Sequence, residues 1–278
     1  MLPDLRDHPL PVVEETLGGK SLSFAGNEVQ SAMRILEPDA LDLEYTRLMM
    51  GFLVFCPRPR RLLMVGLGGG SLAKFCYAYL PEADITTVEI NPHVIALRKD
   101  FAIPDDNARF RVILGDAAQF VAQTPERFDV VIVDGFDALG VPPELNTLQF
   151  YADCRRVLAP AGVVVVNLHS CHPCFSLYVE RLQAAMGSTI TLVSDHEGSN
   201  CLGFACPEEG ASRSHPLGSR RPETMPPPAW AGICSSVARV FLAAKSLRRS
   251  GGAAIRAECL TTGHQSLTSP TSPAVIVT

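Results

Sequence analysis

The chain has 278 residues, of which 47% are hydrophobic and 19% charged, so it can bury a full core as one large domain with a small additional element. Its formal charge of -5 and its lack of any long basic run argue against a nucleic-acid partner. The first residues lack an export signal and no stretch approaches the ~18 apolar residues of a membrane span, so we expect a soluble cytoplasmic protein that binds small molecules.

A small β element is predicted at the N-terminus. Residues 20–26 and 29–36 form short alternating stretches, and Gly26-Asn27 between them is the turn chemistry of a tight hairpin. Apolar residues then recur at helical spacing from Leu41 to Phe55, and Pro57 closes this predicted helix. We therefore assign residues 1–58 to a β hairpin and a linking helix.

From residue 59 onward, apolar runs alternate with helical stretches. The runs are LLMVGLG, ITTVEI, FRVILGD, FDVVIVD and GVVVVNLH. Strands that are buried on both faces look like this, because the helices of right-handed crossovers cover each side of a parallel sheet. The pattern predicts a doubly wound, Rossmann-like α/β domain over residues 59–206.

The end of this domain and the tail have a different pattern. The runs STITLVSD and NCLGFAC are separated only by residues 196–199, too few for a crossover helix, so we expect an antiparallel hairpin at the edge of the sheet. After Cys206 the chain is rich in Gly, Ser, Pro and Arg, with one plausible helix over residues 235–247. We expect residues 207–278 to form a poorly structured or atypical tail.

The cysteine pattern favours a reducing compartment and no metal. The chain has nine cysteines, most of them in apolar surroundings, where they pack as small hydrophobes. The one CxxC pair, Cys171 and Cys174, lacks a second pair at zinc-site spacing.

Gly66, Gly68, Gly69 and Gly70 follow a predicted strand and open a predicted helix. A nucleotide can approach bare backbone and the positive end of a helix at such a place, although tight strand-to-helix turns use glycine anyway. Glu89 ends the next strand about 20 residues later, the spacing at which an acid accepts hydrogen bonds from ribose hydroxyls. The alternative for Glu89 is a solvated carboxylate at a strand end.

Two further strand ends carry acids. Asp116 can accept the amino group of adenine while Ala117 offers a backbone N–H to the ring, but Asp116 also suits the N-cap of the next helix. Asp134 and Asp137 flank a turn after the fourth strand, in the crevice where open α/β sheets place ligands. Such a pair can hold a cationic amine and accept its proton, although Asp137 could be only a turn residue.

Read together, GLGGGS, VEIN, GDAAQF and DVVIVDGFDALGVPPEL resemble the core of the spermidine synthase family, in the same order and at similar separations. The resemblance covers about residues 15–206. It implies the fold of the S-adenosylmethionine-dependent transferases, and transfer of an aminopropyl group from decarboxylated S-adenosylmethionine to an amine acceptor in polyamine biosynthesis. A homodimer is also implied, because family members commonly form dimers.

The resemblance also implies roles for individual residues. Asp134 falls on the catalytic acid, which accepts the proton of the attacking amine, and Asp137 falls on a polyamine-binding acid. Glu89 falls on the ribose ligand and Asp116 on the adenine ligand. Gln30 and Tyr45 fall on the hairpin and gate positions of the acceptor site.

Three departures from the family pattern concern specificity. Ser71 stands where the family's glycine loop continues with an aspartate, Thr46-Arg47 replaces a His-Glu pair, and Ala138 replaces a proline. Losing the acid at Ser71 removes an anchor for the aminopropyl ammonium and a repulsion toward the carboxylate of ordinary S-adenosylmethionine, so either form remains a candidate co-substrate. Arg47, if it faced the pocket unpaired, would repel a polyamine.

Other functions stay open. An S-adenosylmethionine-dependent methyltransferase of the same fold is the second hypothesis, and Glu44, Asp134 and Asp137 favour a cationic acceptor in either case. A non-catalytic nucleotide-binding homologue is the third, suggested by the missing His-Glu pair. An NAD-dependent dehydrogenase is less well supported, because GLGGGS does not match the G-x-G-x-x-G spacing closely.

Overall fold

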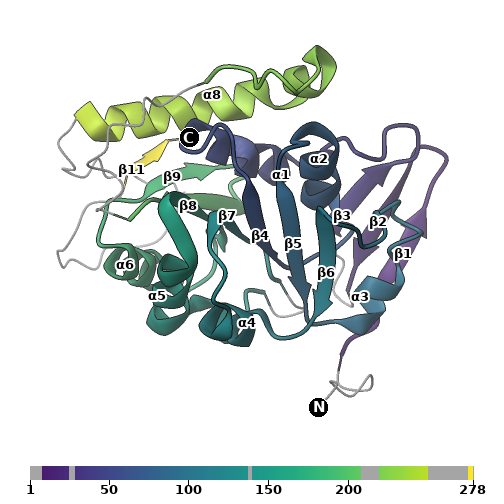
Figure 1. Cartoon of the computed structure of the whole chain (residues 1–278), viewed down its shortest axis with the longest axis horizontal. Coiled ribbons are helices and arrows are strands. Elements are labelled where there is room, and N and C mark those ends of the chain that lie inside the picture. Colours follow the sequence, from purple (N-terminus) through teal and green to yellow (C-terminus); the bar gives the residue numbers. More distant parts are fainter. Residues whose placement is uncertain (1–7, 25–28, 137–139, 208–218, 250–274, 278) are drawn as a thin grey trace, which may run out of the picture.

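An eight-stranded sheet forms the centre of the protein (Figure 1), with the strand order β11-β9-β10-β8-β7-β4-β5-β6. The computed structural model describes residues 8–24, 29–136, 140–207, 219–249 and 275–277. The parallel part of the sheet consists of β4 (Arg61–Val65), β5 (Asp84–Glu89), β6 (Phe110–Leu114), β7 (Phe128–Val133) and β8 (Leu158–His169). The predicted doubly wound, Rossmann-like fold is confirmed.

The order of these strands determines where a ligand can bind. The chain enters the sheet at β4, moves outward to β5 and β6, and then returns to place β7 on the other side of β4. Open α/β sheets bind ligands at such a reversal, outside the carboxyl ends of the strands. The ends of β4 and β7 therefore mark the expected site.

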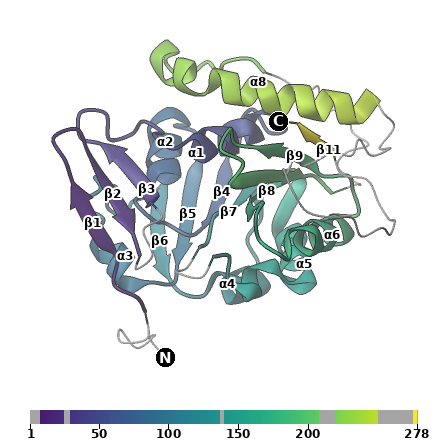
Figure 2. The ribbon, with the colours of Figure 1, turned by 180° about the vertical axis from the view of Figure 1, so that it is seen from behind.

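Helices cover both faces of the sheet. One buried cluster lies on the side of α1 (Glu44–Met49), α2 (Ser71–Tyr79) and α8 (Pro227–Arg249). The other lies on the side of α4 (Ala117–Gln123), α5 (Leu148–Val157) and α6 (Phe175–Met186), as Figure 2 also shows. Leu62 and Met64 of β4 belong to the first cluster, and Leu63 and Val65 to the second. This alternation explains why the strands read as continuous apolar runs.

The antiparallel end of the sheet agrees with the prediction in its pairing. Strands β9 (Thr191–Ser194) and β10 (Asn200–Ala205) form an antiparallel hairpin, and β10 pairs with β8. The hairpin is not the edge, however, because β11 (Val275–Val277) pairs in parallel with β9 on its outer side.

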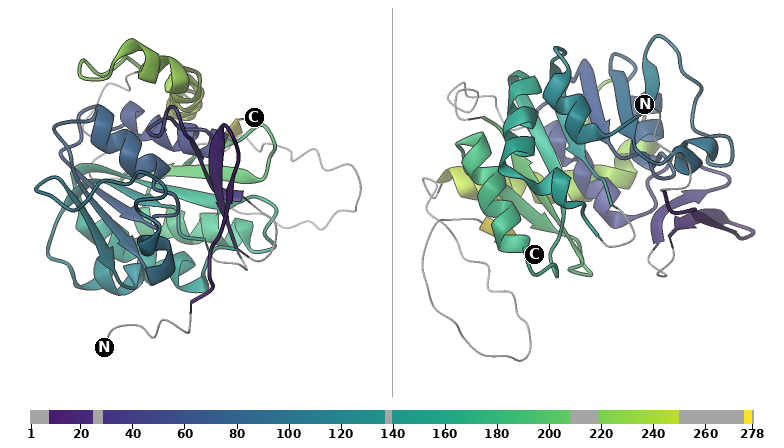
Figure 3. Two further views of the ribbon diagram at one scale, coloured as in Figure 1. Left: turned by 90° about the vertical axis from the view of Figure 1, so that its right-hand side faces the viewer. Right: turned by 90° about the horizontal axis from the view of Figure 1, so that it is seen from below.

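The N-terminal β element is a separate three-stranded antiparallel sheet, shown from two further directions in Figure 3. It consists of β1 (Val12–Glu15), β2 (Gly19–Ser23) and β3 (Val29–Arg34), so the structure adds β1 to the predicted hairpin. The predicted turn at Gly26-Asn27 lies outside the described residues. The predicted linking helix is shorter than expected: α1 is followed by the 3-10 helix η2 (Met50–Val54).

The C-terminal region differs from the prediction. Helix α8 has 23 residues and packs against η2, α1 and β9, so the expectation of a poorly structured tail does not hold for residues 227–249. Its buried residues recur at helical spacing: Ile233, Val237, Val240, Ala244 and Leu247. The expected tail residues 208–218, 250–274 and 278 lie outside the described part.

The remaining elements are α3 (Pro92–Ala96) and η3 (Pro143–Asn146), which lie in connections between strands. None of the helices in the described residues has the length and apolarity that crossing a membrane requires.

Candidate functional site

Asp134 directly follows β7 and is held by its neighbours on both sides. Its backbone N–H donates to the oxygen of Val65 at the end of β4 (2.9 Å). Its side-chain oxygen Oδ1 accepts a hydrogen bond from Nδ2 of Asn167 on β8 (2.9 Å). The predicted catalytic acid therefore stands at the reversal of the strand order, with its carboxyl group oriented by the adjacent strand.

Tyr45 reaches the same carboxyl group from α1. Its one hydroxyl proton faces two acceptors, the backbone oxygen of Gln30 on β3 (3.0 Å) and the Asp134 carboxyl group. Burial, and then the nearby Asp134, raise the pKa of Tyr45 well above its usual value, so this hydroxyl stays protonated and acts as a donor. Three residues predicted separately, Gln30, Tyr45 and Asp134, are thus brought together.

The environment brings the pKa of Asp134 close to neutral pH. Burial raises the pKa of Asp134 to about 6, and hydrogen bonds from Asn167 and Tyr45 lower it in part, because they favour the charged form. A carboxylate with a pKa near the working pH is ionised yet can still take up a proton in a reaction.

The glycine loop lies directly beside Asp134. Gly66 has a φ of +94°, and a Cβ at this position would overlap the backbone oxygen of Asp134. Its N–H donates to the oxygen of Val88 on β5 (2.9 Å). Gly66 therefore contacts the chain at the ends of both β5 and β7. It brings Glu89 and Asp134 together at the carboxyl ends of the parallel strands. Gly68 and Gly70 also have positive φ, and Gly69 packs against Ser31.

Glu89 is only 8% exposed, so it is not the solvated strand-end carboxylate considered as an alternative. Its Oε2 accepts from the N–H of Leu67 in the glycine loop (2.8 Å), and Oε1 accepts from the N–H of Asn91 (2.8 Å). Burial raises the pKa of Glu89, and the backbone hydrogen bonds from Asn91 and Leu67 counter part of this rise. Each carboxylate oxygen can accept a further hydrogen bond, so a role toward ribose stays a prediction.

Ser71 and Asp116 have structural partners of their own. The Ser71 hydroxyl donates to the backbone oxygen of Ala32 (3.2 Å) and lies 3.3 Å from the hydroxyl of Ser31, so it ties the start of α2 to β3. Asp116 caps α4, because its Oδ1 accepts from the N–H of Ala118 (2.8 Å). The N-cap alternative is thus confirmed for Asp116, and the adenine role of Asp116 and Ala117 stays a prediction.

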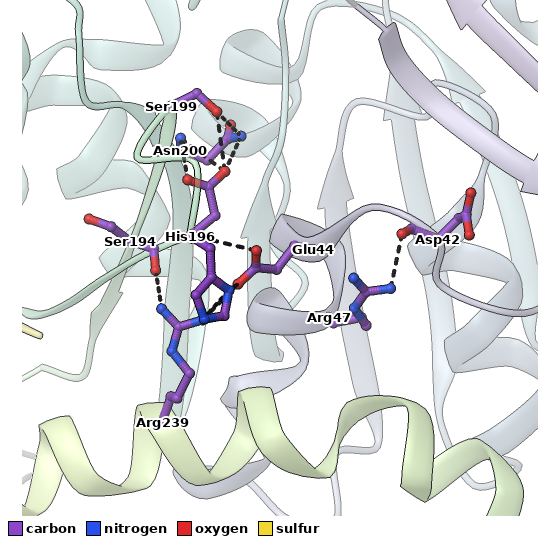
Figure 4. A network of polar contacts seen from close by, with 9 residues as sticks. Asp42, Glu44, Arg47, Ser194, His196, Ser199, Asn200 and Arg239 are labelled. Atoms are coloured by element: carbon purple, nitrogen blue, oxygen red, sulfur yellow. Dashed lines mark hydrogen bonds and ion pairs between the residues drawn. The ribbon is translucent and has the colours of Figure 1, made fainter. Parts of the chain in front are cut away.

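Two charged residues near the predicted acceptor site are engaged elsewhere. Arg47 donates from Nη1 to the backbone oxygens of Leu41 (3.0 Å) and Asp42 (2.9 Å), so its guanidinium group is directed to the backbone just before α1. Glu44 accepts from Arg239 of α8 (2.7 Å), as Figure 4 shows. Its charge is paired with that of Arg239, and a part in attracting a cationic acceptor stays a prediction.

Asn167 was not identified from the sequence. It lies within the apolar run GVVVVNLH and is 2% exposed, and among the described residues its Oδ1 has no hydrogen-bond partner. A single amide at the end of a buried strand was the available signal. The contact of Asn167 with Asp134 depends on β8 lying next to β7, which the sequence did not show.

Some predicted features stay outside these observations. Asp137 and Ala138 lie in the segment 137–139, outside the described residues. Within the described part of the chain there is no group of three or more His, Cys, Asp or Glu side chains that could hold a metal ion.

Comparison with sequences gives one family. The family model described as the spermine/spermidine synthase domain matches residues 43–190. A polyamine aminopropyltransferase of Chromobacterium violaceum is 40% identical over 176 residues, covering 62% of this chain and 67% of that protein. One of Neisseria meningitidis is 35% identical over 183 residues, covering 65% of this chain and 70% of that protein.

Solved structures share the fold. A probable spermidine synthase from Corynebacterium glutamicum aligns with a TM-score of 0.65 at 20% identity, covering 94% of this chain and 95% of that chain. Human methyltransferase-like protein 13, solved in complex with SAH, aligns with a TM-score of 0.56 at 21% identity, covering 72% of this chain and 93% of that chain. At these identities the likeness concerns the fold alone.

Proposed function

The chain belongs to the spermine/spermidine synthase family and is an aminopropyltransferase, and we propose that Asp134 is the base of its reaction, with decarboxylated S-adenosylmethionine as donor and a small cationic amine as acceptor. The observation that carries this proposal is the buried Asp134 carboxyl group at the strand reversal, held by Asn167 and Tyr45.

The reaction requires a neutral amine beside an electrophilic carbon. The positive sulfur of the donor activates the adjacent carbon of the aminopropyl group. The amine nitrogen attacks this carbon, the carbon–sulfur bond breaks, and its electron pair stays on the sulfur of methylthioadenosine. The nitrogen then carries one proton too many, and Asp134 accepts it. Most of the acceleration comes from holding the two reactants in line.

Asn167 and Tyr45 orient the base. Each hydrogen-bonds with the Asp134 carboxyl group, and Asn167 does so from a strand buried in the sheet. A carboxylate held in this way presents one orientation of its lone pairs to the acceptor amine. Gln30 contributes through its backbone oxygen, which fixes the Tyr45 hydroxyl.

The glycine loop supports the proposed nucleotide site. In this proposal, the ribose lies against Glu89 and the loop of Gly66, Gly68, Gly69 and Gly70, and the adenine lies near Asp116 and Ala117. Glu89 already orders the loop through Leu67, so the same carboxylate would connect the loop to the ribose hydroxyls. The catalytic unit then comprises residues 59–206 together with Gln30 and Tyr45 of the N-terminal segment.

The choice of donor depends on Ser71. Its hydroxyl is directed to the backbone of β3, so this position supplies no negative charge to bind an ammonium or repel a carboxylate. Family membership favours decarboxylated S-adenosylmethionine. The neutral position favours methyl transfer from ordinary S-adenosylmethionine as the second candidate function.

The test combines binding with product analysis. Calorimetry measures the affinity for both forms of the donor and for methylthioadenosine, and mass spectrometry identifies the product formed with putrescine. We expect an aminopropylated amine and methylthioadenosine. A methylated product, or binding of ordinary S-adenosylmethionine alone, would overturn the proposal.

A substitution tests the role of Asp134. Asp134→Asn keeps the shape of the side chain but removes the base, so kcat should fall by roughly 10²–10⁴-fold while nucleotide affinity is kept. Asp153→Asn is the matched control, because Asp153 lies on α5 and contacts Arg156 and Gln149 of the same helix. Full activity of the Asp134 variant would show that its assigned role is wrong.

The compartment and the assembly are further proposals. We propose that the enzyme works in the cytoplasm, which is supported by the free thiols of Cys76, Cys154 and Cys201 in the core. We also propose a homodimer, which sedimentation of the full chain would check.

A further inference from the structure

An ion cluster outside the proposed site joins three distant parts of the chain (Figure 4). Arg239 of α8 donates from Nη1 to Oε1 of Glu44 on α1 (2.7 Å) and from Nη2 to the backbone oxygen of Ser194 on β9 (2.6 Å). His196, in the turn after β9, lies 2.5 Å from the same Glu44 oxygen through Nδ1, and its backbone N–H donates to Oε2 (3.1 Å).

The cluster is partly shielded from solvent, and α8 is held close to it. The side chains of Arg239 and Glu44 are 21% and 22% exposed, while His196 is largely exposed. Val240, the next residue on α8, packs against Gly51 of η2 so closely that a Cβ on Gly51 would overlap it. Burial works to raise the pKa of Glu44, but hydrogen bonds from His196 and Arg239 outweigh it and leave this pKa below its usual value. Glu44 is therefore a charged partner for Arg239 at neutral pH.

Helix α1 depends on such outside contacts. It has six residues, and its N-cap residue Leu43 makes no side-chain cap hydrogen bond. A helix this short is not stable by itself, so the position of its first turn is set by tertiary contacts. Glu44 and Tyr45 are consecutive residues of that turn. A contact that fixes Glu44 from the side of α8 also fixes the Tyr45 hydroxyl on the side of Asp134.

We propose that Arg239 is a positioning residue of the reaction: by holding Glu44 at the first turn of α1, it keeps the Tyr45 hydroxyl on the Asp134 carboxyl group. This inference rests on the proposed function for its kinetic consequence. It assigns to the C-terminal helix a part in catalysis, although α8 supplies no residue to the site itself. Arg239 acts through Glu44 and Tyr45.

Loss of Arg239 should shift the acidic limb of the profile of kcat against pH. The groups that face Glu44 are Arg239 and His196, and those that face Asp134 are Tyr45 and Asn167. When Arg239 is lost, the Tyr45 hydroxyl is held less firmly, and the charged form of Asp134 loses a donor. The base then requires a higher pH to ionise, so kcat should fall mainly at the acidic end.

The test uses the full chain and first compares three single substitutions. Arg239→Gln should move the acidic limb upward by about half a pH unit and so lower kcat about two- to threefold near pH 6, with little change in the KM of the donor. Arg239→Lys keeps a positive charge beside Glu44 and should therefore retain most of the activity. Lys245→Gln, on the exposed side of the same helix, is the matched control and should behave as the unmodified protein.

A double-mutant comparison separates positioning from a general loss of stability. If Arg239 acts through Tyr45, Arg239→Gln should cause no further shift of the acidic limb when added to Tyr45→Phe. Additive shifts of the two substitutions would overturn the proposal, as would an unchanged limb in Arg239→Gln. Circular dichroism confirms that each variant is folded.

A second measurement does not depend on turnover. Carbon NMR of labelled aspartate follows the titration of the Asp134 carboxyl group, and its pKa should rise in Arg239→Gln but not in Lys245→Gln. An unchanged pKa would count against the positioning role even if the protein were inactive. Absence of aminopropylated product from the unmodified protein would instead overturn the proposed function and leave this titration interpretable.

Discussion

Asn167 donates a 2.9 Å hydrogen bond to Asp134 from the neighbouring parallel strand. The pairing of Val133 with Val166 sets this contact, because each residue directly follows one member of that pair. The register of β7 and β8, in the interior of the sheet, therefore sets the orientation of the Asp134 carboxyl group.

The first prediction concerns this hydrogen bond. Asn167→Ala removes a donor that favours the charged carboxylate, so the pKa of Asp134 should rise and the acidic limb of kcat/KM should move to higher pH. We expect about a tenfold loss near pH 6 and a smaller loss near pH 8, measured as a pH–rate profile. Asn107→Ala, on the exposed surface, is the control. A loss equal at all pH values would contradict this account.

The second prediction concerns stability and pH. The pKa of Asp134 is about 6 in the folded protein, above the value of about 3.9 for unfolded aspartate, so the unfolded state binds fewer protons between these values. Because of this group, the free energy of unfolding falls by roughly 1–3 kcal/mol as pH rises from about 4 to about 6, and it does not recover above pH 6.

Asp134→Asn removes this pH-dependent cost. Its unfolding free energy relative to the unmodified protein should increase between pH 4 and pH 8, measured by urea unfolding at both values. A relative stability that stays constant, or that falls at pH 8, would show that burial does not penalise the charged form of this carboxyl group.

The third prediction concerns Gly66. Gly66→Ala adds a Cβ that overlaps the backbone oxygen of Asp134 at a φ of +94°, so it should destabilise the protein by roughly 2–4 kcal/mol. Gly232→Ala is the control, because its Cβ would meet open space within α8, where alanine is the better helix former. Thermal unfolding of both variants measures the difference, and equal melting temperatures would refute it.

The fourth prediction concerns Glu89. Glu89→Gln replaces one of the two carboxylate oxygens by an NH₂ group. Only one of the N–H groups of Leu67 and Asn91 then keeps its acceptor, and the other faces a donor. The glycine loop should lose its order, and affinity for methylthioadenosine should fall by about 10- to 100-fold in calorimetry. The KM of the acceptor amine should change little. Retained nucleotide affinity would remove Glu89 from the site.

Local sequence determined the strands, the glycine loop and the acids at the strand ends. A strand buried on both faces must be apolar throughout, so β4 to β8 can be recognised within single runs such as FDVVIVD. Glu89 and Asp134 were identified for the same reason, because each is the first charge that ends such a run. Helix α8 was identified only in part, because Pro- and Ser-rich segments flank its apolar spacing.

Tertiary structure alone decided which of these residues meet. The side-chain hydrogen bonds of Asp134 come from α1 and β8, and Glu44 pairs with Arg239, which is 195 residues away in sequence. Such contacts depend on how the chain returns to the sheet and on the register of its strands. Periodicity within a segment reports burial of that segment, and it carries no information about its partner in space.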